Sequence, residues 1–150
     1  MSEHKVKITW INEREDFSYK GYDRTHKVEF ENGKSFIGSA APEYMGDLNL
    51  INPEEELGAA ISSCHMMSFL FEASRKKFIV ENYEDSAIAI LEKNEKRKMA
   101  VTKMYLNPKI KFKGENIPTI EELNTLHNKA HDGCFIANSV LTEIIINPII

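Results

Sequence analysis

The sequence has few of the residues that mark specialised classes of chain. Among 150 residues it contains two Cys, seven Gly and five Pro, which is too little Cys for a disulfide-rich secreted domain and too little Gly and Pro for a low-complexity chain. Positive charge is not in excess either, because 19 Lys and Arg stand against 23 Asp and Glu and give a net charge of −4. Such a chain lacks the positive electrostatic field that attracts the phosphate backbone of nucleic acids, so we do not expect it to bind nucleic acid.

No apolar run is long enough to predict a membrane span. The longest one, Leu57–Phe71, is interrupted by three Ser and one His. The first residues, Met-Ser-Glu-His-Lys, are not followed by the apolar region of a secretory signal. Since 42% of the residues are hydrophobic, the chain can bury a substantial core. We therefore expect one cytoplasmic domain covering residues 1–150, with no membrane association.

Hydrophobic periodicity predicts an α+β fold in which antiparallel sheets surround a central buried helix. The helix begins at Asn52-Pro53-Glu54-Glu55, which combines a capping residue, a first-turn proline and early negative charge, and it is expected to reach Lys77. A second capping box at Thr119 predicts a helix through His131. The predicted strands are Lys5–Ile11, Phe17–Tyr22, Thr25–Phe30, Ser35–Gly38, Ser86–Leu91, Met99–Phe112, with a break or edge at Pro108, and Val140–Ile146.

The two cysteines allow a functional and a structural interpretation. Cys64 and Cys134 are 70 positions apart and form no CxxC motif. Cys64 falls in the middle of the predicted buried helix, where a cysteine often acts as a small hydrophobic residue. Alternatively, it attacks a peroxide as a thiolate and is then rescued from the sulfenic acid by Cys134. Because the middle of a helix does little to stabilise a thiolate, an Arg or His would have to supply the positive charge.

A metal site is a competing hypothesis. His127 and His131 are four residues apart on one predicted helix face, and Cys134 follows just after the helix end. These three residues could bind zinc in a metal-dependent hydrolase, although a histidine near a helix C-terminus is also stabilised by the helix dipole alone. The acidic pair Glu54 and Glu55 is interpreted as helix-start electrostatics.

Two local segments resemble the OsmC/Ohr family of thiol peroxidases. The first is Asn52-Pro53-Glu54 with Cys64 ten residues after the glutamate, and the second is the run from Cys134 to Ser139, Cys-Phe-Ile-Ala-Asn-Ser. The resemblance covers essentially the whole chain. It implies an OsmC-like fold in an intertwined homodimer that reduces organic hydroperoxides, with Cys64 as the peroxidatic thiol and Cys134 as the resolving thiol.

The resemblance also implies how the thiolate is activated. Glu54 matches the family's catalytic glutamate, which holds an arginine against the thiolate, and Arg24 is the match for that arginine, with Arg14 as the alternative. Arginine suits this role because it is planar and always charged. Phe135 and Ala137 replace the usual Pro and Ser of the second motif, which indicates an OsmC-like subgroup rather than a typical Ohr.

The expected activity needs no metal or organic cofactor, because the thiols carry the electrons. The resemblance implies a dithiol reductant such as a lipoylated protein, and the apolar neighbours Met66, Met67 and Phe69 of Cys64 suit an alkyl substituent on the peroxide. Two alternatives stay open: the metal-dependent hydrolase, and a non-catalytic protein of the same fold that binds a small apolar ligand.

Overall fold

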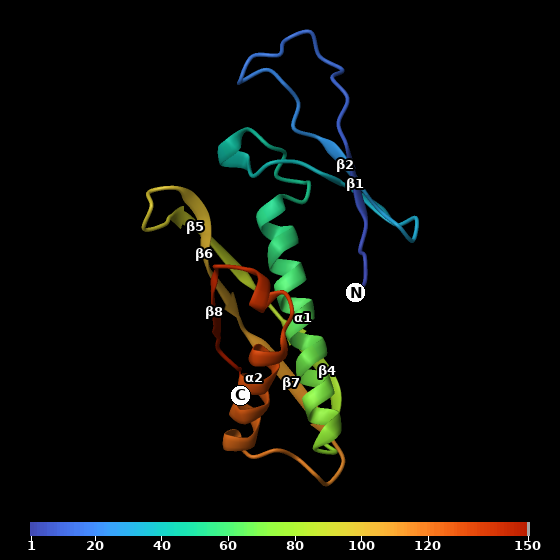
Figure 1. Cartoon of the computed structure of the whole chain (residues 1–150), viewed down its shortest axis with the longest axis vertical. Helices are drawn as coiled ribbons and strands as arrows, with labels where there is room; N and C mark the ends of the chain where they lie inside the picture. Colours follow the sequence, from blue (N-terminus) through green and yellow to red (C-terminus); the bar gives the residue numbers. More distant parts are fainter. Residues whose placement is uncertain (150) are drawn as a thin grey trace. The chain divides into compact units, whose positions relative to one another are not determined.

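The computed structural model describes residues 1–149 and divides into two compact units, Met1–Glu56 and Leu57–Ile150 (Figure 1). Its helices and strands form a mixed α+β structure, as the sequence predicts. Within the described residues, no helix is both long and apolar enough to cross a lipid bilayer.

The first unit is built on a three-stranded antiparallel sheet. Strands β1 (Val6–Thr9), β2 (His26–Phe30) and β3 (Ser35–Gly38) follow one another in space as they do in sequence. Val28 lies opposite Ile8 on one side and opposite Phe36 on the other, so the apolar side chains share one face of the sheet. A short 3₁₀ helix, Pro42–Tyr44, follows the sheet.

The predicted strand Phe17–Tyr22 is wrong. This stretch forms turns, in which the backbone N–H groups of Gly21 and Tyr22 both donate to the carbonyl of Ser18 at 3.0 Å. The turn is reinforced by side chains, since Asp16 accepts from the Ser18 N–H at 2.8 Å and the Ser18 hydroxyl accepts from the Gly21 N–H at 3.1 Å. These local bonds compete with strand pairing for the same backbone groups.

Helix α1 (Pro53–Arg75) begins as predicted and ends two residues early. At its start, Asn52 Oδ1 accepts from the Glu55 N–H at 2.9 Å and Glu55 Oε2 accepts from the Asn52 N–H at 3.0 Å, which completes the predicted capping box. At its end, Lys77 takes a left-handed conformation with φ of 60°, and the Phe78 N–H donates to the carbonyl of Ala73 at 3.0 Å. This is a common way to close a helix.

The second unit contains two sheets. Strands β4 (Ile79–Asp85) and β7 (Pro108–Lys113) pair antiparallel, and a separate sheet has the order β5 (Ile88–Lys93), β6 (Met99–Leu106) and β8 (Glu143–Ile146). β8 runs parallel to β6, so the expectation of purely antiparallel sheets is wrong for this strand. Strand β4 was not predicted, and the predicted strand Met99–Phe112 is two strands.

The break between β6 and β7 has a polar cause. The Asn107 backbone N–H donates to Asp85 Oδ1 at 2.6 Å, and the Asn107 side chain donates to the carbonyl of Ser86 at 2.8 Å. The next residue, Pro108, is buried at the first position of β7, where a missing N–H is tolerated. At this corner the chain passes from β4 to β5 and, on the neighbouring segment, from β6 to β7, so both segments change sheet at the same place.

Helix α2 (Ile120–Gly133) starts at the predicted Thr119 capping box and packs on α1. Their contact forms one core cluster of Phe69, Ala73, Phe78, Leu126 and Ala130, and a second cluster contains Ile61, Met104 and Leu106. Helix α1 is not covered on all sides within this single chain, because Met67 and Phe71 are each 60% exposed. The expectation of a central buried helix therefore holds for only part of the surface of α1.

Candidate functional site

The two cysteines lie beside each other, as free thiols, between the two helices of the second unit. Cys64 lies in the middle of α1 and is 9% exposed, and Cys134 is fully buried at the C-terminal end of α2, where its backbone N–H donates to the carbonyl of His131. The Cys134 sulfur also accepts from the Ala137 N–H at 3.4 Å. Residues 70 positions apart in sequence are thus brought together at the contact of α1 with α2.

The surroundings of Cys134 favour its protonated form. Burial raises the pKa of the Cys134 thiol to about 11, and the neighbouring Cys64 side chain, as a hydrogen-bond partner and a competing negative charge, acts in the same direction. Near neutral pH a thiol with such a pKa is a thiolate only roughly one part in ten thousand of the time. Cys134 is therefore poorly suited to attack first and remains available as a protonated second thiol.

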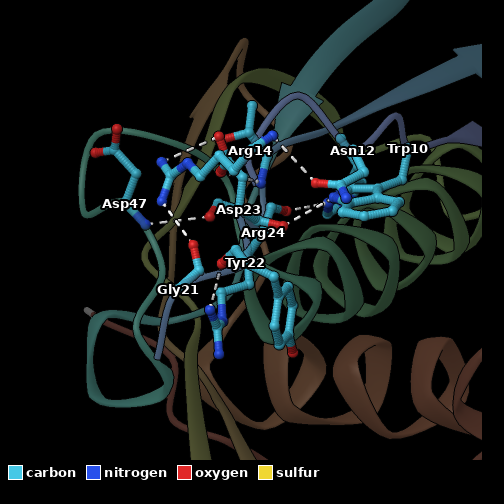
Figure 2. A network of polar contacts seen from close by, with 11 residues as sticks. Trp10, Asn12, Arg14, Gly21, Tyr22, Asp23, Arg24 and Asp47 are labelled. Carbon is cyan, nitrogen blue, oxygen red and sulfur yellow. Dashed lines mark hydrogen bonds and ion pairs between the residues drawn. The ribbon is translucent and has the colours of Figure 1, made fainter. Parts of the chain in front are cut away.

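Arg24 lies in the first unit, where backbone carbonyls and aromatic rings hold its guanidinium (Figure 2). It donates to the carbonyls of Tyr22 and Tyr19, both at 2.5 Å, and lies over the ring of Tyr22 at 3.7 Å from the centroid. Throughout the described residues, Arg24 makes no ion pair with a carboxylate. Its positive charge is therefore held in place without being neutralised.

Arg14, the alternative arginine, is neutralised. Its Nη2 lies 3.2 Å from Asp23 Oδ2, and its Nη1 donates to the carbonyl of Gly21 at 3.1 Å (Figure 2). Glu54 lies in the first turn of α1, is partly exposed and forms no ion pair with Arg24 among residues 1–149. The roles of Arg24 and Glu54 stay predictions, since the structure does not bring these two side chains together.

Two cavities in the first unit share a wall that includes Tyr22, Arg24 and Ser39. One has a volume of about 550 Å³ and is mainly apolar, with Ile8, Trp10 and Phe17 in its lining. The other, of about 490 Å³, is mainly polar and is lined by Arg14, Lys20, Arg24, Asp23 and Asp47, among others. The first unit can therefore accommodate an apolar group beside a cationic surface.

Sequence reasoning missed a buried pair of histidines between α1 and α2. His65 Nε2 and His127 Nδ1 lie 3.1 Å apart, and the two rings are stacked within 3° of parallel. The pKa of each ring is lowered to about 4, mainly because burial disfavours the charged form. The charge of a neighbouring histidine acts in the same direction: His131 on His65, and His65 on His127. Both histidines are therefore neutral near pH 7. The one sequence signal was His65 itself, directly after Cys64 in a helix with few polar residues.

The pairing with His65 removes the geometry of the predicted metal site. His127 was considered a ligand together with His131 and Cys134, but its Nδ1 contacts His65 instead. Within residues 1–149, no three or more His, Cys, Asp or Glu side chains are placed to hold a metal ion together. A metal-dependent hydrolase is therefore not supported by the arrangement of these residues.

Comparison with known proteins shows which proteins this chain is similar to. The family model described as OsmC-like protein matches residues 46–148. The structure of an OsmC-like protein of unknown function from Vibrio cholerae is 42% identical and superposes with a TM-score of 0.95, over 99% of this chain and 100% of that one. No curated protein matches the sequence.

More distant structures share the fold. An organic hydroperoxide resistance protein from Legionella pneumophila is 18% identical with a TM-score of 0.74, over 100% of this chain and 98% of that one. Another from Elizabethkingia anophelis is 19% identical with a TM-score of 0.74, over 99% of this chain and 94% of that one. At these identities the likeness concerns the fold alone.

Proposed function

This chain belongs to the OsmC-like protein family, and from that premise we propose that it is a cysteine-based peroxidase that reduces organic hydroperoxides. The observation that carries the proposal is the contact of two free thiols, Cys64 and Cys134, of which the second has a raised pKa. A raised pKa suits a resolving thiol, because such a thiol stays protonated and does not compete for the first attack.

The proposed reaction has two steps that balance. The Cys64 thiolate attacks the hydroxyl oxygen of the hydroperoxide, the O–O bond breaks, and the products are a Cys64 sulfenic acid and an alkoxide that takes a proton to become an alcohol. Cys134 then attacks the Cys64 sulfur, an S–S bond forms, and the displaced hydroxide leaves as water with the thiol proton of Cys134. An external dithiol, such as a lipoylated protein, would reduce the disulfide again.

Arg24 is proposed as the cation that stabilises the Cys64 thiolate, with Glu54 orienting it. Arg24 is the better candidate of the two arginines because Arg14 is paired with Asp23, whereas the Arg24 charge is not paired with a carboxylate in the described part of the chain. A guanidinium can donate to a thiolate and a carboxylate at the same time without losing its charge.

We also propose that the active protein is a homodimer. Along a helix, Glu54 and Cys64 are about 15 Å apart, which is too far for a carboxylate to orient an arginine at its own chain's thiol. Met67 and Phe71 form an apolar surface on α1 that is exposed in the single chain. A second copy that covers this surface could bring its Glu54 to this chain's Cys64.

We also propose that the protein works in the cytoplasm, because a thiol pair that must be reduced after each turnover requires a reducing compartment. The apolar cavity of about 550 Å³ in the first unit favours substrates with an alkyl or aryl group over hydrogen peroxide.

The test is mass spectrometry of the intact protein before and after one equivalent of cumene hydroperoxide. The proposal expects a loss of two hydrogens, with Cys64 and Cys134 joined in one peptide pair. In the Cys134→Ser variant it expects oxygen gained at Cys64 instead, because a sulfenic acid without a partner thiol is oxidised further. An unmodified Cys64 in both proteins would contradict the proposal.

A second candidate is a non-catalytic protein that binds a small apolar ligand in the cavity lined by Ile8, Trp10 and Phe17. It predicts that Cys64 does not react with cumene hydroperoxide, while cumyl alcohol, the unreactive product, still quenches or shifts the fluorescence of Trp10. Since Trp10 is the single tryptophan of the chain, this signal reports on that cavity alone.

A further inference from the structure

The thioether of Met45 lies against the guanidinium of Arg24. The Met45 sulfur accepts a hydrogen bond from Arg24 Nη2 at 3.8 Å, and the residue is 39% exposed. Met45 also lines the polar cavity of the first unit, together with the cationic side chains of Arg14, Lys20 and Arg24. An oxidisable sulfur that solvent can reach is therefore placed beside the unpaired charge of Arg24, in a cavity that Asp23 and Asp47 also line.

The loop around Met45 holds the backbone of this residue in place. Met45 has a φ of 63°, and its N–H donates to the carbonyl of Pro42 at 3.0 Å. A left-handed conformation is unfavourable for an unbranched side chain and persists only where the surroundings hold it. The next residue, Gly46, packs so closely on the backbone of Ala40 that a Cβ would overlap the Ala40 carbonyl. The backbone thus fixes the point from which the Met45 side chain extends toward Arg24.

We propose that Met45 is a site of oxidation by organic hydroperoxides and that its sulfoxide holds Arg24 more tightly than the thioether does. The sulfur lone pair attacks the hydroxyl oxygen of the hydroperoxide, an S–O bond forms and the O–O bond breaks. The sulfur loses two electrons, and the peroxide is reduced to an alcohol whose oxygen takes the proton of the hydroperoxide. The hydroperoxide is the only oxidant required.

The positive charges explain why Met45 would react before more exposed methionines. Negative charge develops on the leaving alkoxide oxygen, and a guanidinium placed beside the reaction stabilises it. The guanidinium of Arg24 has five N–H donors, and its hydrogen bonds to Tyr22, Tyr19 and Met45 use three of them. The remaining donors can bind the alkoxide oxygen. Met99 is 51% exposed against 39% for Met45, so exposure alone predicts that Met99 reacts first.

The consequence for catalysis rests on the proposed function, in which Arg24 activates Cys64. A sulfoxide oxygen is a far stronger hydrogen-bond acceptor than a thioether sulfur, and a bond from a charged donor to it is stronger again. Oxidised Met45 would hold Arg24 against the wall of its own cavity and slow the attack of Cys64 several-fold. Methionine sulfoxide reductases would reverse the effect.

The oxidation is tested in the Cys64→Ser/Cys134→Ser double variant, which has no thiol to consume the peroxide. After treatment with cumene hydroperoxide, peptide mass spectrometry follows the gain of one oxygen at each methionine. We expect Met45 to react several-fold faster than Met99, and the added change Arg24→Ala to reduce the rate at Met45 alone. A rate at Met45 no higher than at Met99 overturns the proposal.

The effect on activity is tested in the protein that keeps both cysteines. Met45→Gln places an amide oxygen where the sulfoxide oxygen would lie, whereas Met45→Leu has a similar volume and no acceptor. We expect the Gln variant to reduce cumene hydroperoxide several-fold more slowly and the Leu variant to work at least as fast as the unmodified protein. Equal rates in the two variants would overturn the claim that a strong acceptor at position 45 restrains Arg24. Absence of peroxidase activity in the unmodified protein overturns the proposed function instead, and leaves the oxidation result at Met45 standing.

Discussion

His65 Nε2 and His127 Nδ1 meet at 3.1 Å in the core, so a neutral imidazole pair joins the helix that carries Cys64 to the helix that ends at Cys134. The two outer ring atoms, His65 Nδ1 and His127 Nε2, are buried and have no hydrogen-bond partner among the described residues. Protonating either ring would place a charge in this region at a high cost.

The pair predicts a loss of stability in mild acid. The pKa of each ring is about 4 in the folded chain against an ordinary value of 6.5, so the unfolded chain binds more protons between these values. The free energy of unfolding should therefore be highest above about pH 6.5 and should fall as the pH is lowered toward 4. The expected loss is about 3 kcal/mol for each ring that titrates fully. Urea unfolding at a series of pH values measures this.

Two variants make the measurement specific. His65→Leu combined with His127→Phe should flatten the pH dependence, whereas His4→Gln, at an exposed N-terminal histidine, should leave it unchanged. A pH dependence that survives the double substitution would show that other groups cause it.

Replacing Arg24 should move the pH dependence of the Cys64 reaction. Without a neighbouring positive charge the thiolate is less stable, so in Arg24→Ala the midpoint of the rate against pH should rise by about one unit, and the rate near neutral pH should fall about tenfold. Arg14→Ala is the matched control, because Arg14 is paired with Asp23. A profile that moves only in Arg14→Ala would assign the role to Arg14.

Charge placed on the exposed stripe of α1 should separate the proposed dimer. Met67→Glu combined with Phe71→Lys puts charged groups where two apolar side chains are each 60% exposed, and sedimentation should then report a monomer with much reduced peroxidase activity. Met99→Glu, at another exposed methionine, serves as the control for added surface charge. Full activity in a monomer at nanomolar concentration would contradict a site shared between two chains.

Bulky hydroperoxides should be reduced much faster than hydrogen peroxide. Each CH₂ that moves from water to an apolar site contributes about 0.8 kcal/mol, so even ~3 kcal/mol retained in the transition state raises kcat/KM roughly a hundredfold. The comparison uses cumene hydroperoxide, tert-butyl hydroperoxide and hydrogen peroxide with one dithiol donor. Equal kcat/KM values for the three would mean that no apolar cavity takes part.

The features that could be predicted from sequence depend on residues close together in the chain. The capping boxes at Asn52 and Thr119 are formed by residues three positions apart, and both helices start there. Strand β4 was missed because a bulge between Val80 and Asn82 breaks the alternation that would reveal it. The parallel pairing of β8 depends on a strand about forty residues earlier, which no local pattern records.

The candidate site follows the same division. The order and spacing of Glu54, Cys64 and Cys134 are visible in the sequence, whereas the contact of the two thiols is seen only in the structure, and their roles stay predictions. The partner of His127 is 62 positions away, so the spacing to His131 suggested a metal ligand although the ring packs on His65. Partners of buried polar groups are set by how helices pack, which sequence spacing alone does not fix.

The corner at Asp85 and Asn107 bears on the order in which the chain folds. On one side of it Asp85 is paired with Pro108, and on the other side Ile88 is paired with Tyr105, so the two antiparallel ladders continue each other in one register. In residues 79–113, strand pairing can thus start next to the turn at 94–98 and extend away from it. Each new residue pair then closes only a short loop, because its neighbours are already paired. We expect this long bent hairpin to form early, and α2, β8 and the meeting of the two thiols to follow it.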